Sequence, residues 1–112
     1  MQMKRRMRLN KTIEAVEKWA VERGIDKANP RDQFLKVAEE FGEVGAALAR
    51  SDHEALMDGI GDCVVTLIIL AMQNGTTLQD CLNVAYAEMA ERKGKVVNGV
   101  FVKESDLQEA EE

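Results

Sequence analysis

The residues with the clearest chemical potential are carboxylates on two adjacent segments whose patterns predict helices. They are Glu39, Glu40 and Glu43 in the first segment, and Asp58 and Asp62 at the head of the second. Acidic side chains normally avoid the apolar face of a helix, because burying an unpaired charge is costly. Carboxylates gathered there indicate a divalent cation, and a cation in an acidic protein indicates a ligand that carries phosphate.

Helical geometry divides the acids of the first segment. At about 100° per residue, its apolar residues form one stripe and its polar residues form another about 100° away. The apolar stripe is Phe34, Val37, Phe41, Val44 and Leu48, and the polar stripe is Gln33, Lys36, Glu40 and Glu43. Glu40 therefore lies on the shoulder of the predicted buried face with Glu43 one turn further on, whereas Glu39 points nearly the opposite way.

The two aspartates of the second segment share a helix face, because they are four residues apart. That face continues as Val65, Ile69 and Met72, so the aspartates head a stripe that becomes core. Gly59 and Gly61 adjoin the two aspartates, and each glycine weakens a helix by up to about 1 kcal/mol relative to alanine. A close approach of another backbone or of a ligand would explain that cost.

Four carboxylates, Glu40, Glu43, Asp58 and Asp62, make an oxygen-only site that suits Mg²⁺, with Mn²⁺ as the alternative. A di-iron site of the ferritin type needs Glu-x-x-His pairs, and the chain has a single histidine, His53, in a predicted turn. The same histidine leaves no basis for a Ser/His or Cys/His nucleophile. The plain alternative is that these acids are solvated surface residues.

The wider pattern predicts an all-α fold, a four-helix bundle with a short C-terminal β-hairpin. Helices are expected over residues 11–23, 30–50, 54–73 and 78–93, with capping residues at Asn10, Asn29 and Thr77. Asn98-Gly99 between two β-branched runs indicates the hairpin. The 112 residues are expected to form one domain with its core at 10–103, a basic arm at 1–9 and a frayed acidic tail at 104–112.

Composition narrows the class of protein. The net charge is −5 and no basic face spans the chain, which argues against a nucleic-acid partner. The apolar run 63–72 is about half the roughly 20 residues that cross a bilayer, so it predicts a buried helix and no membrane contact. The absence of an apolar leader, together with Cys63 and Cys81 as core residues, predicts a cytoplasmic, reducing location.

The combined pattern resembles the MazG-like nucleotide pyrophosphohydrolases of the all-α nucleoside triphosphate pyrophosphatase superfamily. The resemblance covers about residues 10–103. Its residues are Glu39-Glu40-x-x-Glu43, Gly61-Asp62 before an apolar helix, the lead-in Gln33-x-x-Lys36, and Arg92-Lys93-Gly94-Lys95 before the Asn98-Gly99 hairpin. One position departs from the family pattern of Glu-x-x-Asp on the second helix. Gly59 stands where the family has Glu, and Asp58 is the substitute on the same face.

The resemblance implies Mg²⁺-dependent hydrolysis of a (deoxy)nucleoside triphosphate to the monophosphate and diphosphate, in the control or house-cleaning of a nucleotide pool. Glu39 or Glu40 would take the proton of the attacking water. Gln33, Lys36, Arg92, Lys93 and Lys95 would hold the phosphates, and Trp19 would stack on the base. The family also implies self-association as a dimer or tetramer.

Other interpretations stay open. Residues 92–95 also suit the C-terminal end of a helix, where positive charge offsets the dipole, and Trp19 also suits a partly buried core position. A related pyrophosphohydrolase acting on phosphoribosyl-ATP is a second enzyme hypothesis. A non-catalytic helical interaction module is a third, and it predicts no saturable binding of Mg²⁺ or nucleotide.

Overall fold

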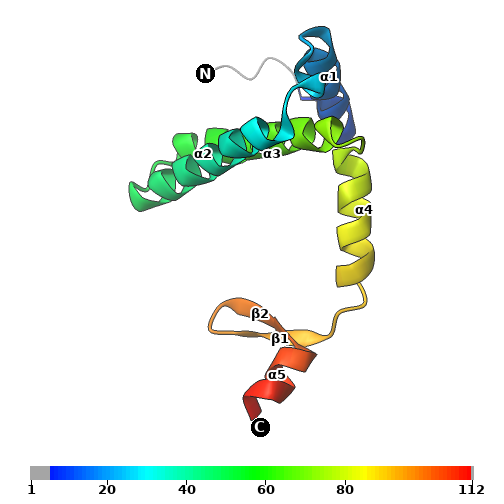
Figure 1. Ribbon diagram of the computed structural model, residues 1–112. Helices are drawn as coiled ribbons and strands as arrows, with labels where there is room; N and C mark the ends of the chain where they lie inside the picture. Colours follow the sequence, from blue (N-terminus) through cyan, green and yellow to red (C-terminus); the bar gives the residue numbers. More distant parts are fainter. Residues whose placement is uncertain (1–5, 112) are drawn as a thin grey trace. The chain divides into compact units, whose positions relative to one another are not determined.

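The computed structural model describes residues 6–111 and divides into two compact units, Met1–Leu78 and Gln79–Glu112. Within the described part, five α-helices and one antiparallel hairpin make up the fold, which confirms the predicted fold class (Figure 1). In chain order the elements are α1 (Leu9–Glu22), the 3₁₀ turn η1 (Ile25–Lys27), α2 (Pro30–Ala49), α3 (His53–Gln73), α4 (Leu78–Met89), β1 (Gly94–Val97), β2 (Val100–Lys103) and α5 (Glu104–Glu111). Met1 to Arg5 of the predicted basic arm lie outside the described residues.

The first unit is built on an antiparallel hairpin of two long helices, α2 and α3, which lie side by side (Figure 1). Asn29 caps α2, as predicted, by accepting a 2.8 Å hydrogen bond from the Arg31 backbone N–H. Asp52 caps α3 by accepting a 3.1 Å bond from the Ala55 N–H. Between the helices Ser51 adopts φ of 55°, a left-handed conformation that reverses the chain.

The face of α2 that packs on α3 differs from the predicted apolar stripe. The buried and half-buried residues of α2 that follow one another at spacings of four and three are Gln33, Val37, Glu40, Val44 and Ala47. Phe34, Phe41 and Leu48, which were expected inside, are 57%, 55% and 60% exposed. Glu40 therefore lies within the α2–α3 seam, between Val37 and Val44, rather than on its shoulder.

Close approach of α2 and α3 explains why the face of α2 with the smaller side chains packs against α3. Gly59 on α3 is buried, and a Cβ atom built on it would lie 3.1 Å from Cγ2 of Val44 and 3.7 Å from the Val44 Cα. Only a residue without a side chain leaves the α2 backbone this close. Large side chains such as Phe34 and Phe41 lie instead on the neighbouring face of α2, about 100° around the helix from Gln33 and Glu40. The glycine at this position is thus a packing requirement of the seam.

A graded substitution tests this role of Gly59. We expect Gly59→Val to lower the free energy of unfolding by about 1–3 kcal/mol, because overpacking forces the helices apart. Gly61→Ala is the matched control, since its added Cβ would meet nothing within 4 Å and alanine favours the helix by up to about 1 kcal/mol. Urea denaturation of both variants gives the comparison, and equal effects would contradict the close-approach argument.

The helix α1 and the turn η1 pack against α3. Ala20 is fully buried there, and the Gln73 side chain donates a 3.0 Å hydrogen bond to the Ile25 carbonyl at the far end of α3. The prediction that Asn10 caps α1 was wrong. Asn10 lies inside the helix, whose N-cap is Arg8 without a side-chain hydrogen bond.

The second unit contains α4, the β1–β2 hairpin and α5. Asn98 and Gly99 have φ of 52° and 80°, the pair of positive values that a two-residue hairpin turn needs, so the hairpin prediction is confirmed. The predicted frayed tail at 104–112 was wrong, because residues 104–111 form α5, which contacts both strands. The Glu104 N–H donates to the Lys93 carbonyl at 2.7 Å, and acidic residues in its first turn suit the helix dipole.

The second unit has little core of its own. None of its residues from 79 to 107 is buried, and α4 contacts neither the hairpin nor α5 within these described residues. The expectation that Cys81 is a core residue was wrong, since it is exposed, whereas Cys63 in α3 is buried. Both cysteines are free. The expectation of a single domain stays a prediction.

One helix, α3, has the length and apolar composition with which a helix can cross a membrane. The core helix of a water-soluble protein meets the same test, so composition alone carries little weight. In this structure α3 packs against α1, η1 and α2, and it carries Asp58 and Asp62 near its start. This helix therefore does not indicate where in the cell the protein is found.

Candidate metal centre

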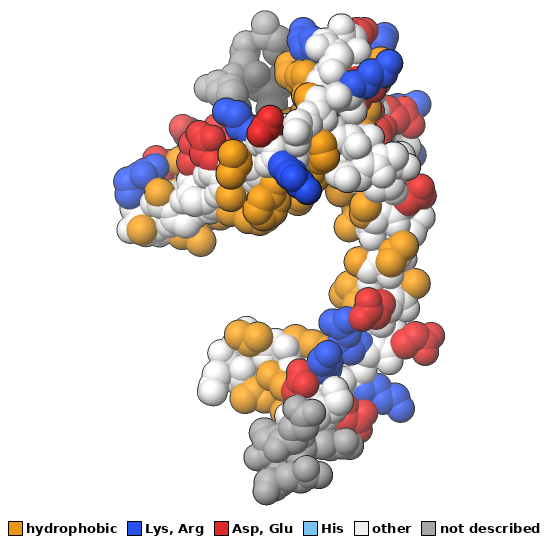
Figure 2. All heavy atoms as spheres, in the orientation of Figure 1, with side chains coloured by type: hydrophobic (Ala, Val, Ile, Leu, Met, Phe, Trp, Pro, Cys, Tyr) orange, Lys and Arg blue, Asp and Glu red, His pale blue; other side chains and the backbone are white. Residues whose placement is uncertain are grey.

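Three carboxylates from the two seam helices converge on one point. Glu40 and Glu43 of α2 and Asp62 of α3 each offer an oxygen, and these three oxygens all lie within 4.8 Å of one another. Glu40 and Asp62 are half-buried and Glu43 is exposed. The antiparallel seam produces this meeting, because it sets the second half of α2 against the first half of α3. Figure 2 shows acidic side chains gathered over these two helices.

Glu40 is the most constrained of the three. Its Oε2 atom is buried and has no hydrogen-bond partner. Burial raises the pKa of Glu40 above its ordinary value, and the nearby charges of Glu43, Asp62 and Glu39 raise it further. A buried carboxylate oxygen without a partner is rare in proteins, and it calls for a proton or a cation.

Asp62 and its neighbour Cys63 feel the same environment. Burial raises the pKa of Asp62, with added repulsion from Asp58 and Glu43. Burial also raises the pKa of the Cys63 thiol, and Glu40, Asp62 and Glu43 add to the effect. A thiol whose pKa is raised stays protonated near neutral pH, so Cys63 packs beside the carboxylates as a neutral group.

A divalent metal ion fits these three carboxylates better than a lysine or arginine side chain does. Among the described residues, the ion pairs of the chain involve neither Glu40, Glu43 nor Asp62. Three carboxylate oxygens with no soft ligand form a hard donor set, which Mg²⁺ and Mn²⁺ prefer. Bound there, such a cation would satisfy Glu40 Oε2 and remove the mutual repulsion of the three carboxylates.

Asp58, the fourth predicted ligand, lies outside the group of three. It is exposed and lines a cavity of about 300 Å³ together with Glu43 and Arg50. Position 59, where the resembled family carries glutamate, faces Val44 in the seam. Asp58 thus stands one turn from Asp62 on the solvent side, and its role as a ligand stays a prediction.

Three of the predicted site residues on α2 make other interactions. Lys36 and Glu39 are both exposed, and they form an ion pair with each other at 3.7 Å. Gln33 donates a 3.1 Å hydrogen bond to the Thr66 carbonyl of α3, which makes it part of the helix packing. Of the two candidates for general base, Glu40 is therefore in the cluster and Glu39 is outside it.

Trp19 is exposed, at 44%, and its stacking on a base stays a prediction. The Arg23 guanidinium lies 4.3 Å from the centroid of its ring. Trp19 lines an apolar cavity of about 390 Å³ with Met7, Thr12, Ala15, Val16 and Val65. Val65 follows Asp62 by three residues on α3, so this apolar cavity begins one turn from the carboxylates.

The three cations near the hairpin belong to the second unit. Arg92 forms a 3.2 Å ion pair with Glu88 one turn earlier. Lys93 lies between α4 and β1, and Lys95 is the second residue of β1. Helix α4 ends at Met89, so the predicted helix end near Lys93 was too late. A contribution of these cations to phosphate binding stays a prediction.

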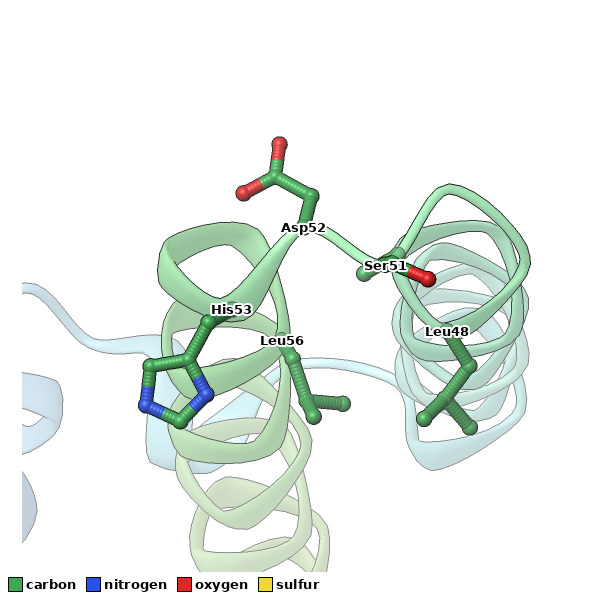
Figure 3. Close-up of a pocket in the computed structure, with 6 residues that line it drawn as sticks. Leu48, Ser51, Asp52, His53 and Leu56 are labelled. Atoms are coloured by element: carbon green, nitrogen blue, oxygen red, sulfur yellow. The ribbon is translucent and has the colours of Figure 1, made fainter.

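The single histidine is separate from the carboxylates. Figure 3 shows His53 and Leu56 projecting from the start of α3 beside Leu48 of α2, around a small cavity of about 220 Å³. Neither Glu40, Glu43 nor Asp62 lines that cavity. Its position agrees with the view that this histidine is not a ligand of the cluster.

Sequence reasoning missed one charged residue near the cluster, Arg50. It follows Glu43 by seven residues, two helical turns, and so shares its face of α2. The spacing of seven residues could have indicated that Arg50 lies on the same face as Glu43. Arg50 is the C-cap residue of α2, however, and lies outside the Glu39-Glu40-x-x-Glu43 motif.

Taken together, the fold and the cluster define an all-helical protein with a carboxylate site between two antiparallel helices. No family model matches the chain, and no solved structure matches it. The chain is similar to an uncharacterized 18.2 kDa protein in the rep-hol intergenic region of Haemophilus phage HP1, with 40% identity over 67 residues. That match covers 59% of this chain and 41% of the phage protein, so the chain spans less than half the length of this relative.

The raised pKa values give a stability prediction. Glu40 and Asp62 hold protons more tightly in the folded chain than in the unfolded chain. In metal-free buffer their contribution to stability is therefore full below the ordinary carboxyl values of 4.5 and 3.8, and it is lost as pH rises through the raised values. We expect Glu40→Gln to raise the melting temperature at pH 7 with EDTA present, and the gain to vanish near pH 4.

The same melts with Mg²⁺ complete the test. Mg²⁺ should raise the melting temperature of the wild-type protein at pH 7 by several degrees and have little effect on Glu40→Gln. Glu39→Gln is the matched control, because Glu39 is exposed and paired with Lys36, and it should respond to Mg²⁺ as the wild type does. Identical behaviour of the two variants would contradict the cation site.

Proposed function

We propose that this protein is a Mg²⁺-dependent nucleoside triphosphate pyrophosphohydrolase. The observation that carries the proposal is the convergence of Glu40, Glu43 and Asp62, with one buried carboxylate oxygen left without a partner. A site that concentrates negative charge in an acidic protein can bind a polyphosphate only when a cation lies between the carboxylates and the phosphates. The resemblance to MazG-like enzymes supplies the reaction class.

The reaction that this class performs is a hydrolysis at the α-phosphorus. Water oxygen bonds to the α-phosphorus, the bond to the α–β bridging oxygen breaks, and diphosphate leaves with that electron pair. When bound, Mg²⁺ would neutralise the triphosphate and lower the pKa of water. Glu43 and Asp62 would hold the cation in place.

Glu40 is the better candidate to accept the proton of the attacking water. Its carboxyl group belongs to the cluster, and its position in the α2–α3 seam fixes its orientation. Glu39 is the alternative, and its ion pair with Lys36 places it on the exposed face. The positively charged side chains that bind the substrate's phosphates would be Lys36, Arg92, Lys93 and Lys95, as the resemblance implies.

The alternative of a non-catalytic interaction module has one observation against it. Three carboxylates in contact repel one another and destabilise the metal-free fold at neutral pH, and a pure packing module gains nothing from that cost. The alternative substrate phosphoribosyl-ATP has the same triphosphate chemistry and is included in the substrate panel.

A product analysis tests the proposal. With Mg²⁺, the purified protein should convert at least one substrate in a panel of canonical and modified (deoxy)nucleoside triphosphates and phosphoribosyl-ATP to monophosphate and diphosphate. Asp62→Asn should lower kcat by about 100-fold or more, because it removes a ligand charge. Asp32→Asn, an exposed aspartate in the first turn of α2, is the matched control. Release of phosphate instead of diphosphate, or full activity of Asp62→Asn, would refute the proposal.

Self-association is part of the same proposal. The α2 face formed by Phe34, Phe41 and Leu48 is exposed in the single chain, and hydrophobic side chains are visible along the α2–α3 pair in Figure 2. An exposed apolar row of this kind is typical of a protein–protein contact surface. A dimeric or tetrameric mass by light scattering is expected, and a monomer at micromolar concentration would contradict it.

A further inference from the structure

A cavity lies directly beside the carboxylate cluster. It has a volume of about 300 Å³ and is lined by Glu43, Ala46 and Arg50 from α2 and its C-cap, and by Ala55, Asp58 and Gly59 from α3. The three small residues leave the space open, and the three charged residues stand around it. Glu43 belongs to both the cavity and the cluster, so the two share this carboxylate as a border.

Arg50 has no partner that explains its place there. Among the described residues, its guanidinium takes part in no ion pair or side-chain hydrogen bond, although Glu43 and Asp58 line the same cavity. Arg23 and Arg92, in contrast, are engaged with Trp19 and Glu88. Arg50 lies about 10 Å along the helix axis from Glu43, which leaves a gap between the carboxylates and the guanidinium.

The features along α3 occur in a fixed order. Asp58 lines the cavity that holds Arg50, Asp62 belongs to the cluster, and Val65 lines the apolar cavity that holds Trp19. Each successive pair is four or three residues apart, so all three lie along one side of the helix. The order is therefore a guanidinium, a cation site and an aromatic apolar cavity, which matches the order of terminal phosphates, reacting phosphate and base in a nucleotide.

Resting on the function proposed above, we propose that the substrate lies along α3 with its β- and γ-phosphates in the cavity at Arg50. The planar guanidinium binds oxygens of these two phosphates in a bidentate manner and holds the diphosphate as it leaves. The base then points toward Trp19. A purely structural role for Arg50, offsetting the dipole at the end of α2, is the competing explanation and predicts no effect on ligands.

Calorimetric titration of the full chain with inorganic pyrophosphate in the presence of Mg²⁺ tests the proposal. Arg50→Ala should weaken pyrophosphate binding about 10- to 100-fold, the loss expected for charge-assisted hydrogen bonds. Arg50→Lys should recover part of the affinity, because it keeps the charge and loses the fork. Arg31→Ala, which removes an exposed arginine at the other end of α2, is the matched control and should bind as the wild type does.

Titrations with Mg²⁺ alone and with nucleoside monophosphate provide the second readout. Both affinities should be unchanged in Arg50→Ala, because neither ligand fills the cavity at Arg50. Unchanged pyrophosphate affinity in Arg50→Ala, or an equal loss in Arg31→Ala, would overturn the proposal.

Failure of this proposal is distinguishable from failure of the proposed function. If triphosphates are hydrolysed to diphosphate while Arg50→Ala leaves KM and pyrophosphate affinity unchanged, the role of Arg50 is wrong and the function stands. If pyrophosphate binding depends on Arg50 but no triphosphate is hydrolysed, the phosphate site stands and the enzymatic function is wrong.

Discussion

The packing of α2 on α3 is the interaction on which the rest of the candidate site depends. The two helices approach closely because Gly59 offers no side chain to Val44. That approach draws Glu40 into the seam between Val37 and Val44, and it brings Asp62 to the same point from the other helix. The carboxylates are thus held together by apolar packing, against their own repulsion.

The electrostatics of the cluster link stability to function. Burial and like charge raise the pKa values of Glu40 and Asp62, so the metal-free fold is under strain near neutral pH. A bound cation would remove this repulsion, and it would bind more tightly because the carboxylates are already assembled. The buried Cys63 thiol beside the cluster stays protonated and adds no charge to it.

Much of the fold was predictable from local signals. Asn29-Pro30 marks the start of α2, and Asn98-Gly99 marks the hairpin, because both act through backbone conformation within a few residues. The face of α2 was not predictable from hydrophobicity, since Phe34 and Phe41 outrank Val37 and Ala47 as apolar residues yet lie exposed. The choice depended on the fit between helices, and that fit is a tertiary property set by Gly59.

In the candidate site, too, relations within one helix were predictable and relations between helices were not. Helical phase found Glu40 and Glu43 as a pair and separated Glu39 from them, because these relations lie within one helix. The exclusion of Asp58 from the group of three and the presence of Arg50 depended on how α3 sits against α2. The three residues of the cluster all belong to the pattern that resembles MazG-like enzymes, and Gly59 is the position that differs from it.

The most direct test of the central claim is a crystal structure of the protein grown with Mn²⁺, with data collected to locate anomalous scattering from manganese. The account predicts a peak coordinated by one oxygen each from Glu40, Glu43 and Asp62, with Glu40 Oε2 no longer without a partner. A structure in which these three side chains hold no manganese at millimolar concentration would contradict it.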